Sequence, residues 1–168
     1  MAKLIILRGP SGAGKSTVSE LLKQRVATKL GVFEQDHYRH GTFNRLDIDN
    51  EVGRHAMFGA VQATLEYGTD VVMEGIMNKA KYEPYFNKLF KDHPDENYFF
   101  YFDVSAEETV RRHATRSKSQ HISDQEMLSW YGRAGRFDYP GEVIIPQDCS
   151  AEQAFEKIIA VTGLAVVA

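Results

Sequence analysis

The sequence has 168 residues, 43% of them hydrophobic, and carries 20 Lys and Arg against 23 Asp and Glu, a net charge of −3. These values are typical of a globular protein with one substantial core, and they argue against a protein that coats DNA or RNA, which would be basic. The apolar runs are too short to cross a bilayer, and no signal peptide is predicted. Cys149 has no second cysteine to pair with, which indicates a reducing compartment, so we expect a cytoplasmic protein.

Strand and helix signals alternate along the chain. Runs of apolar and β-prone residues predict five short strands, at residues 3–9, 31–36, 70–75, 97–104 and 142–146. Apolar residues at helical spacing predict helices between these strands. The first helix is marked by Val18, Leu21, Leu22, Val26 and Leu30, the next by Val52, Ala56, Ala60, Val61 and Leu65, and a third covers about 79–91 and begins near Pro84.

Capping signals predict where the remaining helices begin. Capping boxes are formed by Ser105 with Glu108, Ser123 with Glu126, and Ser150 with Gln153. Strands that alternate with helices need crossover connections, which favour a parallel sheet covered on both faces. We therefore expect one α/β domain over residues 1–168, with a five-stranded parallel sheet between two layers of helices.

The segment RGPSGAGKST, residues 8–17, follows the first predicted strand and opens the first predicted helix. Its spacing Gly9-x4-Gly14-Lys15-Ser16 is the P-loop pattern, in which glycines let backbone amides surround a polyphosphate. The start of the helix adds free amides and the positive end of its dipole. We expect the following residues to bind a nucleotide: Gly9, Pro10, Ser11, Gly12, Ala13, Gly14, Lys15, Ser16 and Thr17.

Each polar residue of the P-loop has an expected partner on the nucleotide. Lys15 brings a cation to the β- and γ-phosphates, the Ser16 hydroxyl ligates Mg²⁺, and Thr17 contacts the α-phosphate. The alternative, a glycine-rich turn before an ordinary helix, does not explain why a lysine and two hydroxyls follow. A guanine-specific GTPase is disfavoured, because NKAK at 78–81 lacks the aspartate of an NKxD motif.

This layout resembles the small P-loop kinases, which include shikimate and gluconate kinases, chloramphenicol phosphotransferase, zeta-toxin-like kinases and polynucleotide kinase domains. The resemblance implies the fold of a P-loop NTPase with a small helical lid, here at about 105–140. In these kinases the second strand commonly ends in an aspartate that orients or deprotonates the acceptor hydroxyl, and Asp36 has that place. The alternative for Asp36 is a helix cap or a solvated loop residue. Arg39 either clamps an anionic part of the acceptor or is a solvated surface residue.

The third strand resembles that of the zeta-toxin-like kinases, since VVMEGIM ends its hydrophobic run in Glu-Gly. The resemblance implies that Glu74 lies beside the P-loop, where it holds Mg²⁺ through water or contacts the acceptor hydroxyl. A carboxylate that pairs with a nearby lysine is the alternative. His37 and His40 lack a partner cluster, so no metal site is expected there.

The stretch SAEETVRRHATRSKSQ resembles the lid of these kinases and implies that Arg112 and Arg116 stabilise charge on the γ-phosphate. The two residues share one helix face, and a solvated basic face paired with Glu107 and Glu108 is the alternative. Trp130 is better explained by packing than by stacking on a base. Gln147 follows the last strand, where related kinases hold adenine, and is a candidate contact to the base.

These observations predict an ATP- and Mg²⁺-dependent kinase that phosphorylates a hydroxyl of a small-molecule acceptor. Lys15, Asp36, Arg112 and Arg116 are the expected catalytic residues. The acceptor is expected to contact Asp36, Arg39 and Glu74. The metal is expected to contact Ser16 and Glu74. Two alternatives stay open: a polynucleotide 5′-hydroxyl kinase, which the acidic net charge disfavours, and a regulatory protein that binds ATP without transferring phosphate. The sequence leaves the acceptor and the oligomeric state undetermined.

Overall fold

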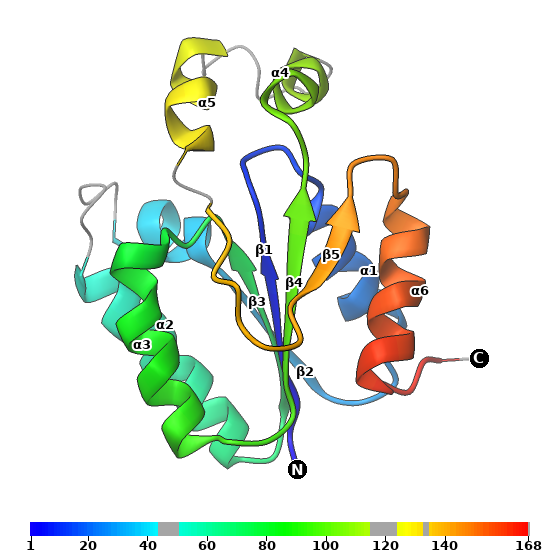
Figure 1. The fold of residues 1–168 in the computed structure, drawn as a ribbon. Coiled ribbons are helices and arrows are strands. Elements are labelled where there is room, and N and C mark those ends of the chain that lie inside the picture. The colour runs from blue at the N-terminus through cyan, green and yellow to red at the C-terminus, as the bar shows by residue number, and fades with distance from the viewer. Residues whose placement is uncertain (44–50, 115–123, 133–134, 168) are drawn as a thin grey trace.

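A computed structural model describes residues 1–43, 51–114, 124–132 and 135–167 (Figure 1). Its centre is a five-stranded sheet in the order β2-β3-β1-β4-β5, in which every neighbouring pair of strands is parallel. The strands are β1 (Leu4–Arg8), β2 (Leu30–Glu34), β3 (Asp70–Gly75), β4 (Asn97–Asp103) and β5 (Val143–Pro146). The P-loop strand β1 is thus central, and the carboxyl ends of all five strands lie at one edge of the sheet.

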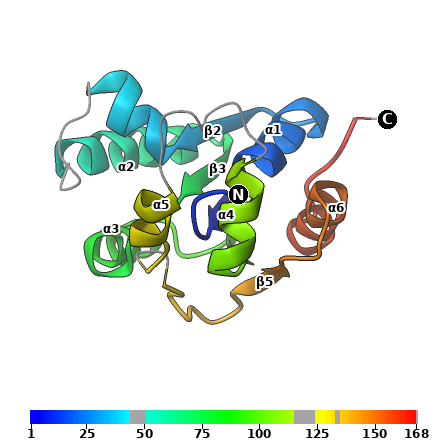
Figure 2. The same cartoon turned by 90° about the horizontal axis from the view of Figure 1, so that it is seen from above.

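Helices cover both faces of the sheet. The helical elements are α1 (Lys15–Arg25), η1 (His37–Thr42), α2 (Glu51–Glu66), α3 (Lys79–Asp92), α4 (Ala106–Ala114), α5 (Asp124–Tyr131) and α6 (Ala151–Thr162). Helices α2 and α3 pack on one face and α1 and α6 on the other, while α4 and α5 lie beyond the carboxyl ends of the strands (Figures 1 and 2). The predicted three-layer α/β architecture of a P-loop protein is confirmed.

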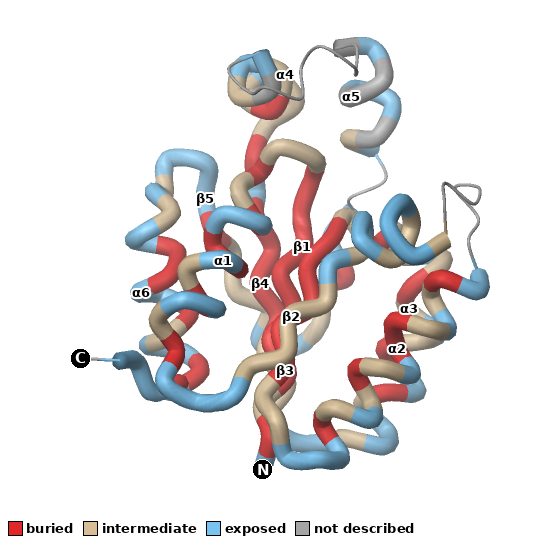
Figure 3. Tube along the Cα trace, turned by 180° about the vertical axis from the view of Figure 1, so that it is seen from behind, coloured by how far each residue is buried: buried red, intermediate tan, exposed pale blue. Residues whose placement is uncertain are grey.

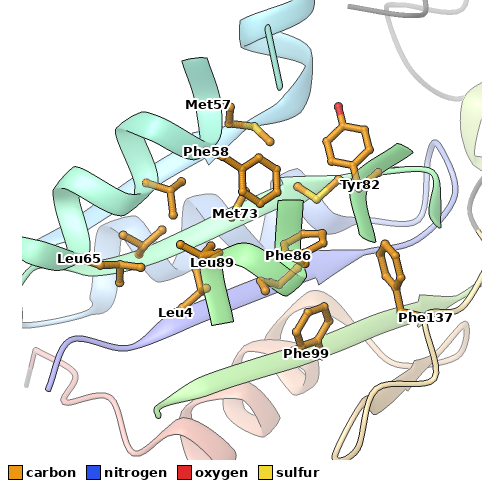
Figure 4. Packing of buried hydrophobic residues seen from close by; sticks show 14 of the residues in the cluster. Leu4, Met57, Phe58, Leu65, Met73, Tyr82, Phe86, Leu89, Phe99 and Phe137 are labelled. Carbon is orange, nitrogen blue, oxygen red and sulfur yellow. The ribbon is translucent and has the colours of Figure 1, made fainter. Parts of the chain in front are cut away.

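Alternate residues of β1 point to opposite faces of the sheet and divide the core in two. Leu4 and Ile6 pack with α2 and α3, whereas Ile5 and Leu7 pack with α1 and α6. The central strands are buried over most of their length, whereas the described residues of α4 are mostly intermediate or exposed (Figure 3). The α2–α3 side is rich in aromatic rings, with Phe86 at their centre (Figure 4). Since parallel strands buried on both faces need continuous apolar runs, their sequences were readable as strands.

Two predicted boundaries were wrong because the chain makes other backbone contacts. Helix α1 ends at Arg25, and Leu30 belongs to β2, because the chain after α1 pairs with the C-terminal segment: Ala27 N–H donates to the Ala165 carbonyl at 2.8 Å. Strand β2 ends at Glu34 rather than at Asp36. Gln35 and Asp36 already turn into the helical segment η1.

Two predicted helix features also differ. The buried face of α2 contains Met57, Val61 and Leu65, as well as Gly53 and Phe58, whereas Val52 is 57% exposed and Ala56 and Ala60 are only partly buried. Helix α3 begins at Lys79, so Pro84 lies inside it. Pro84 is exposed, so the Ala80 carbonyl that loses its helical donor faces water instead of the core.

Of the predicted capping boxes within the described ranges, the one at Ser150 is complete and the one at Ser105 is half formed, because Ser105 N–H donates to Gln147 Oε1 and not to Glu108. Ser150 Oγ accepts from Gln153 N–H at 3.2 Å, and Gln153 Oε1 accepts from Ser150 N–H at 2.9 Å, a complete capping box. Ser105 Oγ accepts from Glu108 N–H at 3.2 Å. Ser123 lies outside the described residues. Within those same ranges, none of the helices combines the length and apolar character that a bilayer crossing requires.

Phe86 is the test of the aromatic core. Its ring is fully buried and lies 5.0 to 5.8 Å, centroid to centroid, from the rings of Phe58, Phe90, Phe99 and Phe137. We expect Phe86→Ala to lower the free energy of unfolding by about 3–5 kcal/mol, measured by urea denaturation. Tyr67, which is 90% exposed, is the control, and Tyr67→Ala should change stability by less than about 0.5 kcal/mol. Equal effects of the two substitutions would contradict this packing.

Candidate active site

The P-loop adopts the backbone that its glycines allow. Gly9, Gly12 and Gly14 have φ angles of +150°, +81° and +102°, as the sequence predicted. A Cβ atom on Gly9 would lie 2.7 Å from the carbonyl oxygen of Phe102 in β4, so only glycine fits at this point. Gly14 caps the start of α1 in the left-handed conformation. The sequence therefore shapes the loop directly.

A cavity of about 160 Å³ opens at the start of α1. It is lined by Gly12, Gly14, Lys15, Ser16 and Thr17. The first α-helical hydrogen bond of α1 joins Val18 N–H to the Gly14 carbonyl, so the amides of residues 15–17 precede it at the positive end of the helix dipole. The buried Lys15 ammonium donates to the carbonyls of Gly9 and Pro10 at 3.0 and 2.8 Å. Amides and an ammonium around one cavity make a site for a polyphosphate.

Ser16 and Glu74 meet at the edge of this cavity. The Ser16 hydroxyl donates to Glu74 Oε1 at 2.9 Å, and Glu74 is only 6% exposed at the end of β3. Burial raises the pKa of the Glu74 carboxyl, and the Lys15 charge and the Ser16 hydrogen bond oppose that rise. Glu74 therefore lies beside the P-loop, as expected.

The Ser16–Glu74 pair fits Mg²⁺. This ion prefers oxygen ligands and is usually held by one or two carboxylates together with substrate phosphates and water. No group of three or more His, Cys, Asp or Glu residues that could hold a metal by themselves occurs in the described parts of the chain. A hydroxyl and a carboxylate beside a phosphate cavity match an ion that arrives with the nucleotide.

A second cavity, of about 230 Å³, adjoins the first and shares Gly14 and Thr17 with it. Apolar and polar groups line it on the α6 side of the sheet. The lining residues are Ala13, Gly14, Thr17, Val18, Phe102, Arg112, Ile145, Pro146, Cys149, Ser150, Ala151 and Ala154. A mostly apolar cavity continuous with a phosphate site has the form expected for the nucleoside part of a nucleotide.

Arg112 joins α4 to both sides of this second cavity. Its guanidinium donates to the Ala13 carbonyl of the P-loop at 3.2 Å and to the Gln147 carbonyl at 2.6 Å, and it pairs with Glu108 at 2.7 Å. Arg111 pairs with the same Glu108. Arg112 thus lines the second cavity, which we call the nucleoside cavity. The sequence analysis had instead predicted a contact between Arg112 and the γ-phosphate. Arg116 lies outside the described residues, as does the side chain of Trp130.

Gln147 does not line the nucleoside cavity. Its side-chain oxygen accepts from Ser105 N–H at 3.1 Å, at the N-terminal end of α4. Pro146, Cys149 and Ser150, its neighbours in sequence, line the cavity instead. The segment after β5 therefore borders the cavity as predicted, with Gln147 tying α4 to it.

Asp36 lies where β2 gives way to η1. Its side chain is exposed and makes no capping hydrogen bond, although the residue precedes η1. The register of β2 and β3 pairs Glu34 with Glu74, and Asp36 follows Glu34 by two residues, so the carboxylates of Asp36 and Glu74 lie at the same edge of the sheet. Arg39, on η1, is partly buried. The carboxyl ends of β1, β2 and β3 thus bring the P-loop, Glu74 and Asp36 together.

The sequence analysis missed Gln35, which supports this corner. Its side-chain amide donates to the Tyr82 hydroxyl at 2.7 Å, and its oxygen accepts from Met77 N–H at 3.0 Å. A Cβ on Gly75 would lie 2.5 Å from the Gln35 oxygen. One glutamine therefore fixes the ends of β2 and β3 and the start of α3 relative to each other. The available signal in the sequence was Gly75 after Glu74, because a glycine at a strand end indicates that another group approaches the backbone closely.

Arg8 was missed as well, although it begins the P-loop segment. It is fully buried, its Nη2 donates to the carbonyls of Met77 and Gly135 at 2.8 and 3.0 Å, and its guanidinium lies 3.6 Å from the Phe137 ring centroid. Burial lowers its pKa to about 10. Nothing in a sequence marks an arginine at a strand end as buried, because its partners are distant main-chain carbonyls.

A family model described as an AAA domain matches residues 5–129, three quarters of the chain. The chain belongs to this family. The matched region of this AAA domain protein contains the P-loop, Asp36, Glu74 and Arg112. Comparison with curated protein sequences returns no match.

Several solved structures with the same fold are kinases. A sugar kinase from Janibacter sp. HTCC2649 superposes with a TM-score of 0.76 at 16% identity, over 98% of this chain and 96% of that one. A gluconokinase from Sinorhizobium meliloti 1021 gives 0.70 at 17% identity, over 96% and 91%. The APS kinase of Mycobacterium tuberculosis, in complex with AMPPNP and APS, gives 0.67 at 18% identity, over 95% and 96%. The resemblance to P-loop kinases that the sequence indicated is confirmed in the fold.

Glu74→Gln tests the pair with Ser16. The folded Glu74 carboxyl binds its proton more tightly than the unfolded one, so its contribution to stability falls as pH rises above about 4.5. We expect the nucleotide-free variant to be at least as stable as the wild type at pH 8, with a weaker pH dependence in urea unfolding between pH 5 and 8. Calorimetry should show weaker Mg²⁺-dependent nucleotide binding. The control Glu66→Gln, at an exposed site on α2, should change neither the pH dependence of unfolding nor the binding of nucleotide.

Arg112→Gln tests the nucleoside cavity. The substitution removes the hydrogen bonds to the Ala13 and Gln147 carbonyls and the guanidinium that lines the cavity. ATP binding should therefore weaken about tenfold or more. Binding of inorganic triphosphate, which needs only the first cavity, should be unchanged in calorimetry. Arg111→Gln is a matched control, because Arg111 pairs with the same carboxylate but does not line the cavity. Equal losses for ATP and triphosphate would contradict the assignment.

Proposed function

We propose that the protein is an ATP- and Mg²⁺-dependent phosphotransferase that moves the γ-phosphoryl group of ATP to a hydroxyl of a small molecule. The observation that carries the proposal is the meeting of the P-loop cavity, the Ser16–Glu74 pair and Asp36 at one edge of the sheet. A phosphate-binding loop alone would serve any nucleotide-binding protein. A carboxylate beside the far end of that cavity is what an acceptor hydroxyl needs.

The donor is held by the P-loop. Amides of the loop and of residues 15–17 surround the β-phosphate, and Lys15 turns from the carbonyls of Gly9 and Pro10 to the γ-phosphate oxygens. Ser16 and Glu74 would hold Mg²⁺, directly or through water, and the ion would neutralise charge on the phosphates. The nucleoside lies in the cavity bordered by Arg112. This arrangement leaves the γ-phosphorus facing Asp36.

Asp36 receives the acceptor. The acceptor oxygen attacks the γ-phosphorus, the bond from that phosphorus to the bridging oxygen breaks, and ADP leaves. Asp36 accepts the proton of the hydroxyl late in this step, since phosphoryl transfer is loose and depends mainly on positioning. The exposed Asp36 carboxylate makes no capping hydrogen bond and is available for that contact.

Helices α4 and α5 form the lid, within one domain of residues 1–168. They lie over the strand ends in Figures 1 and 2 and are fastened by Arg112 to the P-loop and to the segment after β5. Arg116, four residues after Arg112 in the sequence and outside the described residues, is the residue assigned to the γ-phosphate. A closed lid keeps water from the phosphoryl group and limits ATP hydrolysis.

The structural neighbours support a small acceptor. They include a sugar kinase and a gluconokinase, whose acceptors are small hydroxylated molecules. The acidic net charge of −3 supports the same reading against a nucleic-acid end. We therefore place the acceptor among small polyhydroxylated molecules, in a cytoplasmic setting.

The test is acceptor-dependent ADP release from a panel of sugars, sugar acids, nucleosides and antibiotics. The wild type should hydrolyse ATP slowly alone and respond strongly to one class of acceptor. Asp36→Asn should lower that turnover roughly 100-fold or more with ATP affinity unchanged. Asp95→Asn, at an exposed loop on the opposite end of the sheet, is the control and should match the wild type. ATP binding without stimulation by any acceptor would favour the regulatory alternative.

A further inference from the structure

Two arginines converge on Tyr82, next to Asp36. Arg54 lies on α2, and its guanidinium carbon is 5.8 Å from the ring centroid of Tyr82 and 5.7 Å from that of Tyr85. Arg39 lies on η1, which packs against α2. The charges of Arg54 and Arg39 both favour ionisation of the Tyr82 hydroxyl, while the dominant effect of burial raises its pKa. Arg54 therefore lies near the Tyr82 ring, and the charges of Arg39 and Asp36 act on the same hydroxyl.

The hydroxyl of Tyr82 faces this group of charges. In Figure 4 it points away from the aromatic cluster, while the ring packs on it. Gln35 donates to the hydroxyl and fixes its position at 2.7 Å. Arg54 thus lies near two packed tyrosine rings, and Arg39 lies on the neighbouring element η1.

Neither arginine has a counterion in the described parts of the chain. The Nε atoms of Arg39 and Arg54 are buried without a hydrogen-bond partner, and no ion pair joins either side chain to a carboxylate there. Arg25, Arg111 and Arg136 each pair with a carboxylate, of Glu152, Glu108 and Glu142 respectively. Arg8 also has buried nitrogens without a partner, but its Nη2 donates to the carbonyls of Met77 and Gly135. Two neighbouring cations with shielded, unused donors are costly unless an anion completes the site.

We propose that Arg39 and Arg54 together bind an anionic group, a carboxylate or a phosphate, on the acceptor whose hydroxyl lies at Asp36. Planar guanidiniums match both anions with paired hydrogen bonds. This inference rests on the proposed kinase function for the identity of the ligand as an acceptor. It narrows the substrate from any hydroxylated molecule to a hydroxy acid or a phosphorylated polyol. Arg54 is the member of the site that sequence analysis did not identify.

The first experiment measures anion binding without turnover. With the P-loop saturated by AMPPNP and Mg²⁺, thermal unfolding is followed in sodium sulfate and in sodium chloride of equal ionic strength. Sulfate should stabilise the wild type more than chloride, and this difference should vanish in the double variant Arg39→Gln/Arg54→Gln. Arg25→Gln, which removes an exposed arginine on α1, is the control and should keep the difference. An equal sulfate effect in all three proteins, or none in the wild type, would overturn the anion site.

The second experiment separates the two sources of negative charge. Glucose, gluconate and glucose 6-phosphate, and adenosine and AMP, are compared as acceptors in ADP release. A charged member should be preferred over its neutral counterpart, and Arg39→Gln or Arg54→Gln should raise its KM roughly 10- to 100-fold. Arg54→Lys should recover only part of this loss, because it keeps the charge without the fork.

The outcomes distinguish the two proposals. Preference for the neutral member, or variants with unchanged KM, would overturn the anionic acceptor while leaving the kinase standing. Absence of turnover with every compound would count against the proposed function, while the sulfate experiment still decides whether Arg39 and Arg54 bind an anion.

Discussion

The hydrogen bond between Ser16 and Glu74 connects the two halves of the site. Ser16 belongs to the first turn of α1, whose position depends on the P-loop backbone, and Glu74 ends β3, the strand paired with β1. The register that places Glu74 opposite Leu7 brings its carboxylate beside the loop. Without that pairing, the P-loop cavity and the proposed acceptor site around Asp36 would lie at the same edge of the sheet without this contact between them. The P-loop helix and the carboxyl end of β3 are therefore joined directly.

Local sequence was sufficient wherever the structure depends on local rules. The φ angles of Gly9, Gly12 and Gly14, the cap at Ser150, and the buried strands all follow from residues close in the chain. The central position of β1 made its strand continuously apolar and so easy to recognise. The placement of Asp36 and Glu74 followed from the rule that parallel strands end at one edge. Most of the donor site was therefore predictable from the sequence.

The acceptor corner was less predictable because its contacts span large sequence separations. Gln35 acts through Met77 and Tyr82, and Arg54 approaches two tyrosines of another helix. A sequence shows that Arg54 is charged, but not that its neighbours are aromatic instead of acidic. For the same reason α2 was assigned the wrong apolar face at its start, where Gly53 is buried and Val52 is exposed. Only packing decides such choices.

Arg8 shows how the lid is constrained. It anchors the segment after α5 at Gly135 and Phe137, and it holds Met77 of the acceptor corner through the same nitrogen. At the other end of the lid, Arg112 anchors α4 to the P-loop and to Gln147. A cation fully removed from water cannot leave its carbonyl partners without leaving them unpaired in the core, so the Arg8 anchor is the more costly to break. Closure over a nucleotide would therefore move α4 and α5 about the Arg8 end, while the partly exposed Arg112 contacts rearrange around the bound nucleoside. In the proposed kinase, the lid and the acceptor site around Asp36 would therefore share Arg8 as a common anchor.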